Sequence, residues 1–187
     1  LTLETLAGVK HLTLHLNGNI VERVTVDMGE PILSSQDIPV ALPMSYVVSY
    51  PLEIENISFD VTCVSMGNPH AVIFVDDMSR YDLHHIGALI EHYPLFPRRT
   101  NVEFVEILSP DSLKMRVWER GTGETMACGT GACASLVAAV LNGKSRRQAT
   151  LHLQGGDLQI EWNEKDNHVY MTGDAVTVFE GEWPDDK

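Results

Sequence analysis

Cys128 has sequence surroundings that suit acid–base chemistry. It lies in the segment ERGTGETMACGTGACASLVAAVLNGK at 119–144, where an apolar, alanine-rich run continues from Thr130 for about three turns. Cys128 therefore stands where a helix begins, and the free N–H groups of Gly129, Thr130 and Gly131 would point towards its sulfur or a bound anion. We expect the helix dipole to favour the thiolate and lower the pKa of this thiol, so that it can both take and give a proton.

The other two cysteines lack such surroundings. Cys63 lies in an alternating strand and Cys133 inside the apolar helix, so we expect both in the core. The alternative for Cys128 is also a packing cysteine, beside a flexible loop, but glycines at 129 and 131 favour function because a Cβ there would obstruct an approaching carboxylate. No His or Asp stands at zinc-ligand spacing from these thiols, and no metal site is predicted.

Two further polar pairs could act with this cysteine. Asn68 and His70 belong to the turn GNPH, where the amide both donates and accepts hydrogen bonds and histidine is the side chain that most readily exchanges protons near neutral pH. Glu119 and Arg120 end a strand directly before the glycine loop. The alternatives are an ordinary Asn-Pro turn with a structural histidine, and a surface ion pair.

A local basic spot, RRTN at 98–101, stands out in an acidic chain and could meet a carboxylate. A solvated loop explains it equally well.

The elements that must position these residues are short strands and two helices. Alternation predicts strands over 2–6, 11–16, 20–28, 47–50, 53–57, 59–66, 101–108 and 112–119, a buried strand over 71–75, and closing strands over 150–154, 158–162, 168–171 and 175–179. Helical spacing predicts helices over 83–92 and from Thr130 onward. A turn is predicted at 17–19 and a connecting segment at 29–43. Many strands with two helices indicate an α+β fold with a mostly antiparallel sheet.

Composition narrows the class of partner. The 187 residues carry 26 acidic against 13 basic side chains, a formal net charge of −13, which disfavours nucleic acid and anionic membranes as partners. Three cysteines without a CxxC pair indicate free thiols in a reducing compartment, so we expect a cytoplasmic protein. The chain opens on Leu1 in a strand pattern, and we expect it to begin inside a fold.

Three motifs together resemble the diaminopimelate epimerase family. They are GNPH at 67–70, RTNVEFV at 99–105 and ERGTGETMACGTGACA at 119–134, and their order and spacing agree as well as their wording. The resemblance extends over essentially the whole chain. It implies two pseudo-symmetric α+β domains, each placing a cysteine at the start of a central helix wrapped by sheet, with the substrate between them and neither cofactor nor metal.

The resemblance also assigns roles. It implies that LL- and meso-diaminopimelate are interconverted, one thiolate removing the α-proton while the opposing thiol protonates the other face. Cys128 would be the second of these cysteines, with His70 and Glu119 setting its protonation. Substrate contacts would come from the following residues: the N–H groups of Gly129 and Thr130 at the reacting carboxylate, Asn68, Asn101 and Arg120 at the distal end, and Glu119 at an ammonium group.

One departure from the family is large. The first domain's cysteine and its substrate contacts have no counterpart in this chain. We therefore expect residues 1–28 to be the tail of a truncated first domain, 29–173 a complete second domain, and 174–187 a strand returning to the first. On this view the chain alone cannot epimerise, because a single cysteine serves only one face of the substrate. An exposed sheet edge could drive self-association, which leaves a homodimer open.

Other functions compete with this one. A proline racemase or hydroxyproline epimerase uses a similar CGTG helix start, although the pairs Glu119-Arg120 and Asn68/Asn101 favour a substrate with a second charged end. A catalytically dead binding module descended from an epimerase is a second alternative. A cysteine hydrolase would need a base beside Cys128, for which His70 is the one candidate.

Overall fold

One mixed sheet organises the protein, and the computed structural model describes it over residues 1–5 and 8–182. Its strands run in the order β1-β2-β3-β12-β11-β10-β8-β7-β6-β5-β4, with β9 paired to β8. The strands are β1 Thr2–Thr5, β2 Gly8–Asn17, β3 Ile20–Gly29, β4 Tyr50–Ile54, β5 Ile57–Ser65, β6 Pro69–Phe74, β7 Asn101–Ser109, β8 Ser112–Glu119, β9 Gly123–Thr125, β10 Gln148–Leu153, β11 Gly156–Trp162 and β12 Val169–Asp174. Pairing is antiparallel except at β6/β7 and β8/β10, which confirms the mostly antiparallel α+β prediction.

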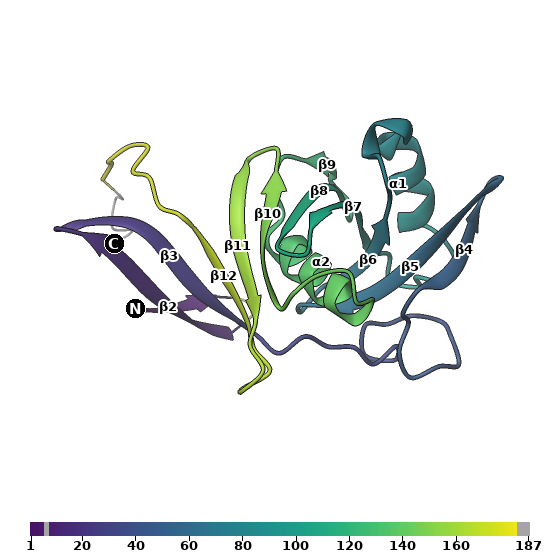
Figure 1. Ribbon diagram of the computed structural model, residues 1–187, viewed down its shortest axis with the longest axis horizontal. Helices are drawn as coiled ribbons and strands as arrows, with labels where there is room; N and C mark the ends of the chain where they lie inside the picture. Colours follow the sequence, from purple (N-terminus) through teal and green to yellow (C-terminus); the bar gives the residue numbers. More distant parts are fainter. Residues whose placement is uncertain (6–7, 183–187) are drawn as a thin grey trace, which may run out of the picture.

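Helix α2, Gly129–Leu141, is the centre around which the sheet curves. Residues 131–139 are all buried, and the helix contacts β5, β6, β7, β8, β10, β11 and β12 (Figure 1). Its alanines keep the helix slim, so the strands approach closely on several sides. The prediction of a central helix wrapped by sheet is confirmed for this part of the chain.

Helix α1, Leu83–Glu91, covers the opposite face of β7 and β8. Asp82 caps it by accepting hydrogen bonds from the N–H groups of His84 and His85. The 3-10 turn Met78–Arg80 leads into it. Neither α-helix of the described residues is long and apolar enough to cross a bilayer.

The strands between the two helices present alternate residues to two separate cores. On β7, Val102 and Phe104 belong to the cluster under α1, whereas Val105 belongs to the cluster around α2. Since side chains alternate along a strand, Glu103 faces α2 with Val105. On the neighbouring strand, His70 shares that face with Val72, which lies in the α2 cluster. Because side chains alternate along each strand, Glu103 and His70 both face the core around α2.

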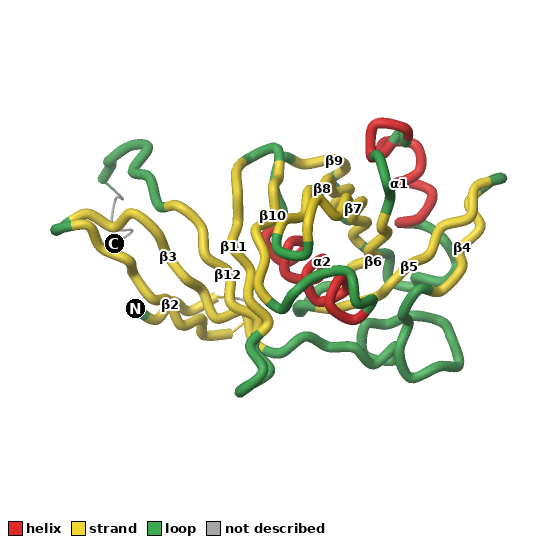
Figure 2. Tube along the Cα trace, in the orientation of Figure 1, coloured by secondary structure: helices red, strands yellow, loops and turns green. Residues whose placement is uncertain are grey.

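Strands β1, β2 and β3 project from the side of the sheet away from α1, beyond β12 (Figure 2). Many of their apolar side chains are exposed, and the exposed set includes Leu3, Val9, Leu14, Leu16 and Ile20. Met28 of β3 packs against the core around α2, whereas β1 and β2 contribute no residue to either core cluster.

The predicted elements differ from the observed ones in a few places. The turn at 17–19 and helix 83–92 are confirmed within a residue or two, whereas the connecting segment predicted over 29–43 extends further, over residues 30–49. The strand predicted over 47–50 is wrong, since Ser49 adopts a positive φ of 51° and only Tyr50 belongs to a strand. The strand predicted over 53–57 is wrong because Glu55 adopts a positive φ of 56° at the turn between β4 and β5. The strand predicted over 175–179 does not form; only Ala175 keeps a ladder-like bond, from its N–H to the carbonyl of Glu22. Leu6, at the end of the first predicted strand, lies outside the described residues.

Candidate active site

Cys128 occupies the N-cap position of α2. Its backbone is extended (φ −142°, ψ 107°), and its side chain makes no capping hydrogen bond to the helix. The carbonyl accepts the first helical hydrogen bond, from Ala132 at 2.9 Å. The residue is 7% exposed, so its sulfur is nearly enclosed at the start of the helix.

The first amides of α2 have different partners. The Gly131 amide acts on the Cys128 sulfur, where it lowers the pKa of the thiol without forming a capping hydrogen bond. Within residues 1–5 and 8–182, the N–H groups of Gly129 and Thr130 have no hydrogen-bond acceptor. Such free amides at a helix start suit a carboxylate, as the sequence predicts.

The predicted lowering of the thiol pKa is wrong. Burial raises the pKa of Cys128 to about 11, and the negative charge of Glu103 adds to this increase, with a smaller contribution from Glu119. The Thr130 hydroxyl and the Gly131 amide act in the opposite direction without overcoming it. The free thiol is therefore protonated at neutral pH, because desolvation and two carboxylates outweigh the helix terminus.

Two glycines of α2 let protein atoms, not only a ligand, approach closely. A Cβ on Gly131 would lie 2.8 Å from Glu103 Oε1 and 3.3 Å from Cys128 Sγ. A Cβ on Gly129 would lie 2.9 Å from Met171 Sδ. The need for glycine here is thus explained by neighbouring side chains.

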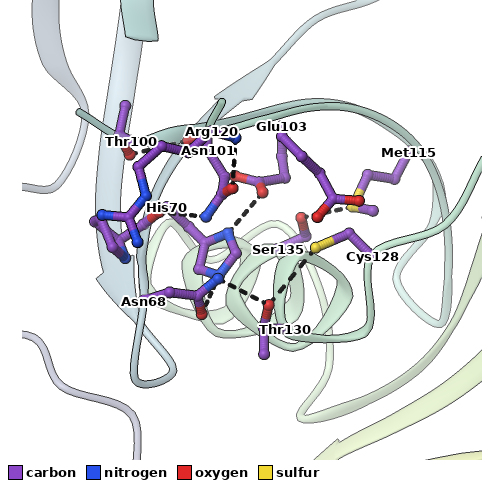
Figure 3. A network of polar contacts seen from close by, with 12 residues as sticks. Asn68, His70, Thr100, Asn101, Glu103, Met115, Arg120, Cys128, Thr130 and Ser135 are labelled. Carbon is purple, nitrogen blue, oxygen red and sulfur yellow. Dashed lines mark hydrogen bonds and ion pairs between the residues drawn. The ribbon is translucent and has the colours of Figure 1, made fainter. Parts of the chain in front are cut away.

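A chain of hydrogen bonds connects a buried carboxylate to the cysteine (Figure 3). Glu103 Oε1 lies 2.6 Å from His70 Nδ1, and His70 Nε2 lies 3.1 Å from Asn68 Oδ1. Asn68 Nδ2 donates to Thr130 Oγ1 at 3.3 Å, and that hydroxyl lies 3.6 Å from Cys128 Sγ. Asn68 and His70 therefore reach the cysteine through Thr130 rather than by direct contact.

Asn101 and Arg120 form a second cluster beside this chain. Asn101 is 4% exposed; its Nδ2 donates to the carbonyl of Pro69 at 2.8 Å and its Oδ1 accepts from the N–H of Arg120 at 2.9 Å. The Arg120 guanidinium is at the surface and donates to the carbonyl of Arg98 at 3.1 Å. Asn101 thus joins β6 to the end of β8, and its role in binding substrate stays a prediction.

Glu119 is half-buried at the end of β8 and accepts a hydrogen bond from the Thr125 hydroxyl. Strand β9, which carries Thr125, folds back on β8 through the pair Glu119 and Gly123. The hairpin places this carboxylate near enough to the cysteine to oppose its ionisation.

Comparison with known proteins decides the family. The family model described as diaminopimelate epimerase matches residues 62–178, which contain the whole site. The chain belongs to the diaminopimelate epimerase family.

Relatives in this family are similar over nearly the whole chain. The diaminopimelate epimerase of Acetivibrio thermocellus is 60% identical over 96% of this chain and 64% of its own length. That of Moorella thermoacetica is 55% identical over 98% of this chain and 66% of its own length. The chain thus spans about two thirds of the length of the curated relatives that it matches.

Solved structures with low sequence identity share the fold. A hydroxyproline epimerase from Agrobacterium vitis with bound trans-4-hydroxy-L-proline superposes with a TM-score of 0.66 at 15% identity, covering 92% of this chain and 55% of that one. A probable proline racemase from Agrobacterium radiobacter gives 0.64 at 16% identity, covering 99% and 60%. At such identities the likeness concerns the fold alone.

Two buried carboxylates of this diaminopimelate epimerase family member were missed from the sequence. Glu103 is the charged residue inside the otherwise apolar run NVEFV, and that interruption is the signal that could have found it. Glu91 closes the buried face of α1, one position after Ile90, and is 2% exposed. A carboxylate at a buried position requires partners, so each points to a polar network.

Proposed function

We propose that this chain supplies one face of the two-cysteine site of a cofactor-independent epimerase that interconverts LL- and meso-diaminopimelate. The observation that carries the proposal is Cys128 at the start of α2, next to two helix amides that have no acceptor among the described residues. Membership of the family and the 60% identity to a diaminopimelate epimerase support the choice of substrate.

The chemistry follows from the geometry around Cys128. The amides of Gly129 and Thr130 would bind the carboxylate at the reacting carbon and stabilise the charge that builds on it as the α-proton leaves. The thiol, protonated at rest, would donate a proton to its face of the α-carbon. In the reverse direction the thiolate is needed, and a substrate ammonium group beside Glu119 would favour it by offsetting the local negative charge.

The distal end of the substrate would be held by the second cluster. Asn68, Asn101 and the surface guanidinium of Arg120 provide amide and cationic donors for a carboxylate. Glu119, at the adjacent strand end, provides the acceptor for an ammonium group. A substrate with an amino acid at both ends fits this arrangement of charges.

The domain division is part of the same proposal. Residues 1–28 and 174–187 would belong with a first domain that carries the opposing cysteine, and 29–173 would form the second domain. The exposed apolar side chains of β2 and β3 and the relatives' greater length support it. A homodimer is an additional proposal, for which the exposed strands offer the surface.

The test compares the 187-residue chain with the product of its complete reading frame. Each is incubated with LL-diaminopimelate in deuterated water, and isomers and α-deuterium are measured by chromatography and NMR. We expect conversion by the full reading-frame product if it supplies a second cysteine, and none by the chain alone. Cys128→Ser should lower the turnover by about 10²–10⁴-fold.

Three outcomes would overturn the proposal. They are LL-to-meso turnover by the chain alone, turnover that survives Cys128→Ser, and turnover of proline or hydroxyproline in place of diaminopimelate. The last would assign the protein to the proline racemase-like enzymes. A full reading-frame product that binds diaminopimelate without exchanging its α-hydrogen would instead indicate a binding module.

A further inference from the structure

Glu103 is a buried carboxylate whose environment does not suit a purely structural role. The residue is 0% exposed near the start of β7, and its Oε1 lies 2.6 Å from His70 Nδ1. Its Oε2 is buried without a hydrogen-bond partner among the described residues. Leaving a carboxylate oxygen unpaired in the core is destabilising, so an apolar residue would serve packing better.

The hydrogen bonds that start at Glu103 run in one direction. Asn68 donates through Nδ2 to Thr130, so its Oδ1 faces His70 Nε2 as an acceptor and that nitrogen must carry a hydrogen. A proton then lies between His70 Nδ1 and Glu103 Oε1 whichever of the two holds it. Thr130, which accepts from Asn68, has its own hydroxyl proton left for Cys128 Sγ. Each donor in the chain therefore points towards the sulfur.

Glu103 also acts on the sulfur through space. Its Oε1 and Cys128 Sγ both lie within 3.3 Å of the single point where a Gly131 Cβ would be (Figure 3). No side chain stands between them there, because residue 131 is glycine. With the shared proton on His70, Glu103 carries a negative charge, and that charge is felt at the sulfur in a region that excludes water.

We propose that Glu103 is a positioning residue of this site with two separate effects: it anchors His70 at the start of the hydrogen-bond chain that ends on Cys128, and its negative charge beside Gly131 disfavours the thiolate and so holds the sulfur in the thiol form. The inference rests on the proposed function, in which Cys128 is the proton-transfer group. It makes the thiol, not the thiolate, the resting state of this face. A proton donor is thus ready before any ligand binds.

The neighbours of the two groups act in both directions. On Cys128, burial, Glu103 from β7 and Glu119 from β8 raise the pKa of the thiol, whereas Thr130 and the Gly131 amide of its own helix lower it. On Glu103, burial raises the pKa of the carboxyl most, His70 from β6 lowers it, and Glu119 raises it. Among these, Glu103 has the largest charge effect on Cys128, and it raises the pKa of that thiol.

The first test measures the reactivity of Cys128 towards iodoacetamide as a function of pH, with mass spectrometry to locate the label. Glu103→Gln removes the charge and keeps the shape, so the midpoint of the profile should fall by about one pH unit. At a fixed pH below the midpoint, labelling should be about tenfold faster, because the thiolate is the reactive form. A profile that is unchanged, or displaced to higher pH, would overturn the proposal.

Glu106→Gln is the matched control. It lies on the same strand but on the opposite face, where Oε1 accepts from the N–H of Met78 at 2.6 Å. Its removal should leave the Cys128 profile where it was. An equal displacement in both variants would show a general charge effect and would also contradict a specific role for Glu103.

The second test asks whether Glu103 fixes the tautomer of His70, which is measured by ¹⁵N NMR of the imidazole ring. In the native chain and in Glu103→Gln, Nε2 should carry a hydrogen, since an amide can still bond Nδ1. In Glu103→Leu the side chain cannot form a hydrogen bond with Nδ1, so the imidazole ring should exchange between its two tautomers. If Glu103→Leu fails to fold, the Gln variant and the labelling profile still decide the matter. Neither test needs substrate, so the two failures can be told apart: a full reading-frame product without epimerase activity would count against the proposed function, whereas an unchanged labelling profile in Glu103→Gln would count against this inference.

Discussion

At the scale of single residues, Cys128 is controlled by opposing neighbours rather than by the helix alone. The sequence correctly placed it at a helix start, but the pKa of the thiol is raised, to about 11, where a lowered value was expected. Burial is the main cause, and the carboxylate that adds most to it, Glu103, comes from β7, a strand outside the cysteine's own motif. A local pattern around a cysteine cannot reveal which charges the fold brings to it.

Thr130→Val should make Cys128 less reactive. The Thr130 hydroxyl donates towards the sulfur and lowers the pKa of the thiol, so an isosteric methyl group moves that pKa further up. Labelling by iodoacetamide at pH 8 to 9 should slow by about fivefold, the equivalent of a net hydrogen bond of about 1 kcal/mol. Thr122→Val, at an exposed loop position, should label at the native rate. Faster labelling of Thr130→Val would contradict the assigned direction of that bond.

Gly131→Ala should destabilise the protein by overpacking the site. The added Cβ would lie 2.8 Å from Glu103 Oε1 and 3.3 Å from Cys128 Sγ, and both of those side chains are buried. We expect a loss of about 1–3 kcal/mol in the free energy of unfolding, measured in urea by tryptophan fluorescence. Gly181→Ala places its Cβ no closer than 3.7 Å to Phe179 and should change stability by less than about 0.5 kcal/mol. Equal stability of the two variants would refute the close approach.

The polar residues of the site were predicted unevenly, for a physical reason. Asn68 and His70 belong to the turn GNPH, which stands out by its composition. Glu103 is one acidic residue within a strand. Its burial depends on pairing of β7 with both β6 and β8. A local sequence pattern cannot predict such long-range strand pairing. The charged residue within the apolar run NVEFV could be noticed, but its burial could not be predicted.

At the scale of elements, α1 holds in place the loop after β8, which carries Arg120 of the second cluster. The buried carboxylate of Glu91 accepts from Trp118 Nε1 at 2.7 Å through one oxygen and from the Gly121 N–H at 2.9 Å through the other. Gly121 follows Arg120 directly. The C-terminal end of α1 therefore anchors the loop after β8, which carries Arg120.

Glu91→Gln should loosen that loop. An amide has a single acceptor oxygen, so either Trp118 or Gly121 loses its partner, at a cost of about 1–3 kcal/mol in the free energy of unfolding. Hydrogen exchange at residues 120–122 should quicken by more than exchange in α2. Glu55→Gln, an exposed neighbour of His85, is the control and should leave both measurements unchanged. Unaltered exchange in the loop would show that Glu91 does not anchor it.

Elements were predicted best where their signals are local. Helix 83–92 has a capping aspartate and a clear apolar spacing, and strand 112–119 matches to the residue. Strand β9 is short, and only its pairing to β8 defines it. The segment 175–179 alternates like a strand but lacks a partner to pair with along its length, so β-propensity alone did not make it one.

At the scale of the whole molecule, the protein combines a well-packed unit around α2 with an exposed sheet extension. The two core clusters lie on opposite faces of β5–β8, one around α2 and one under α1. Strands β1 and β2 contribute no residue to either cluster. The mostly antiparallel α+β class and the central helix followed from the pattern of elements. The surface that β1–β3 leave open could be foreseen only through the family resemblance, since alternation predicts a covered face without saying what covers it.

That exposed surface should make the 187-residue chain self-associate. Leu14 is 40% and Leu16 62% exposed on β2, and Leu14 lies opposite Val24 on β3, so an apolar stripe faces solvent. Contiguous apolar surface of this kind drives association. Sedimentation velocity should show a concentration-dependent increase in the weight-average mass, which the double variant Leu14→Ser, Leu16→Ser should lower towards the monomer. His15→Ser, between them on the opposite face of the strand, should associate like the native chain because it removes no apolar side chain. A native chain that stays monomeric at every concentration would show that this stripe is too weak to act as an interface.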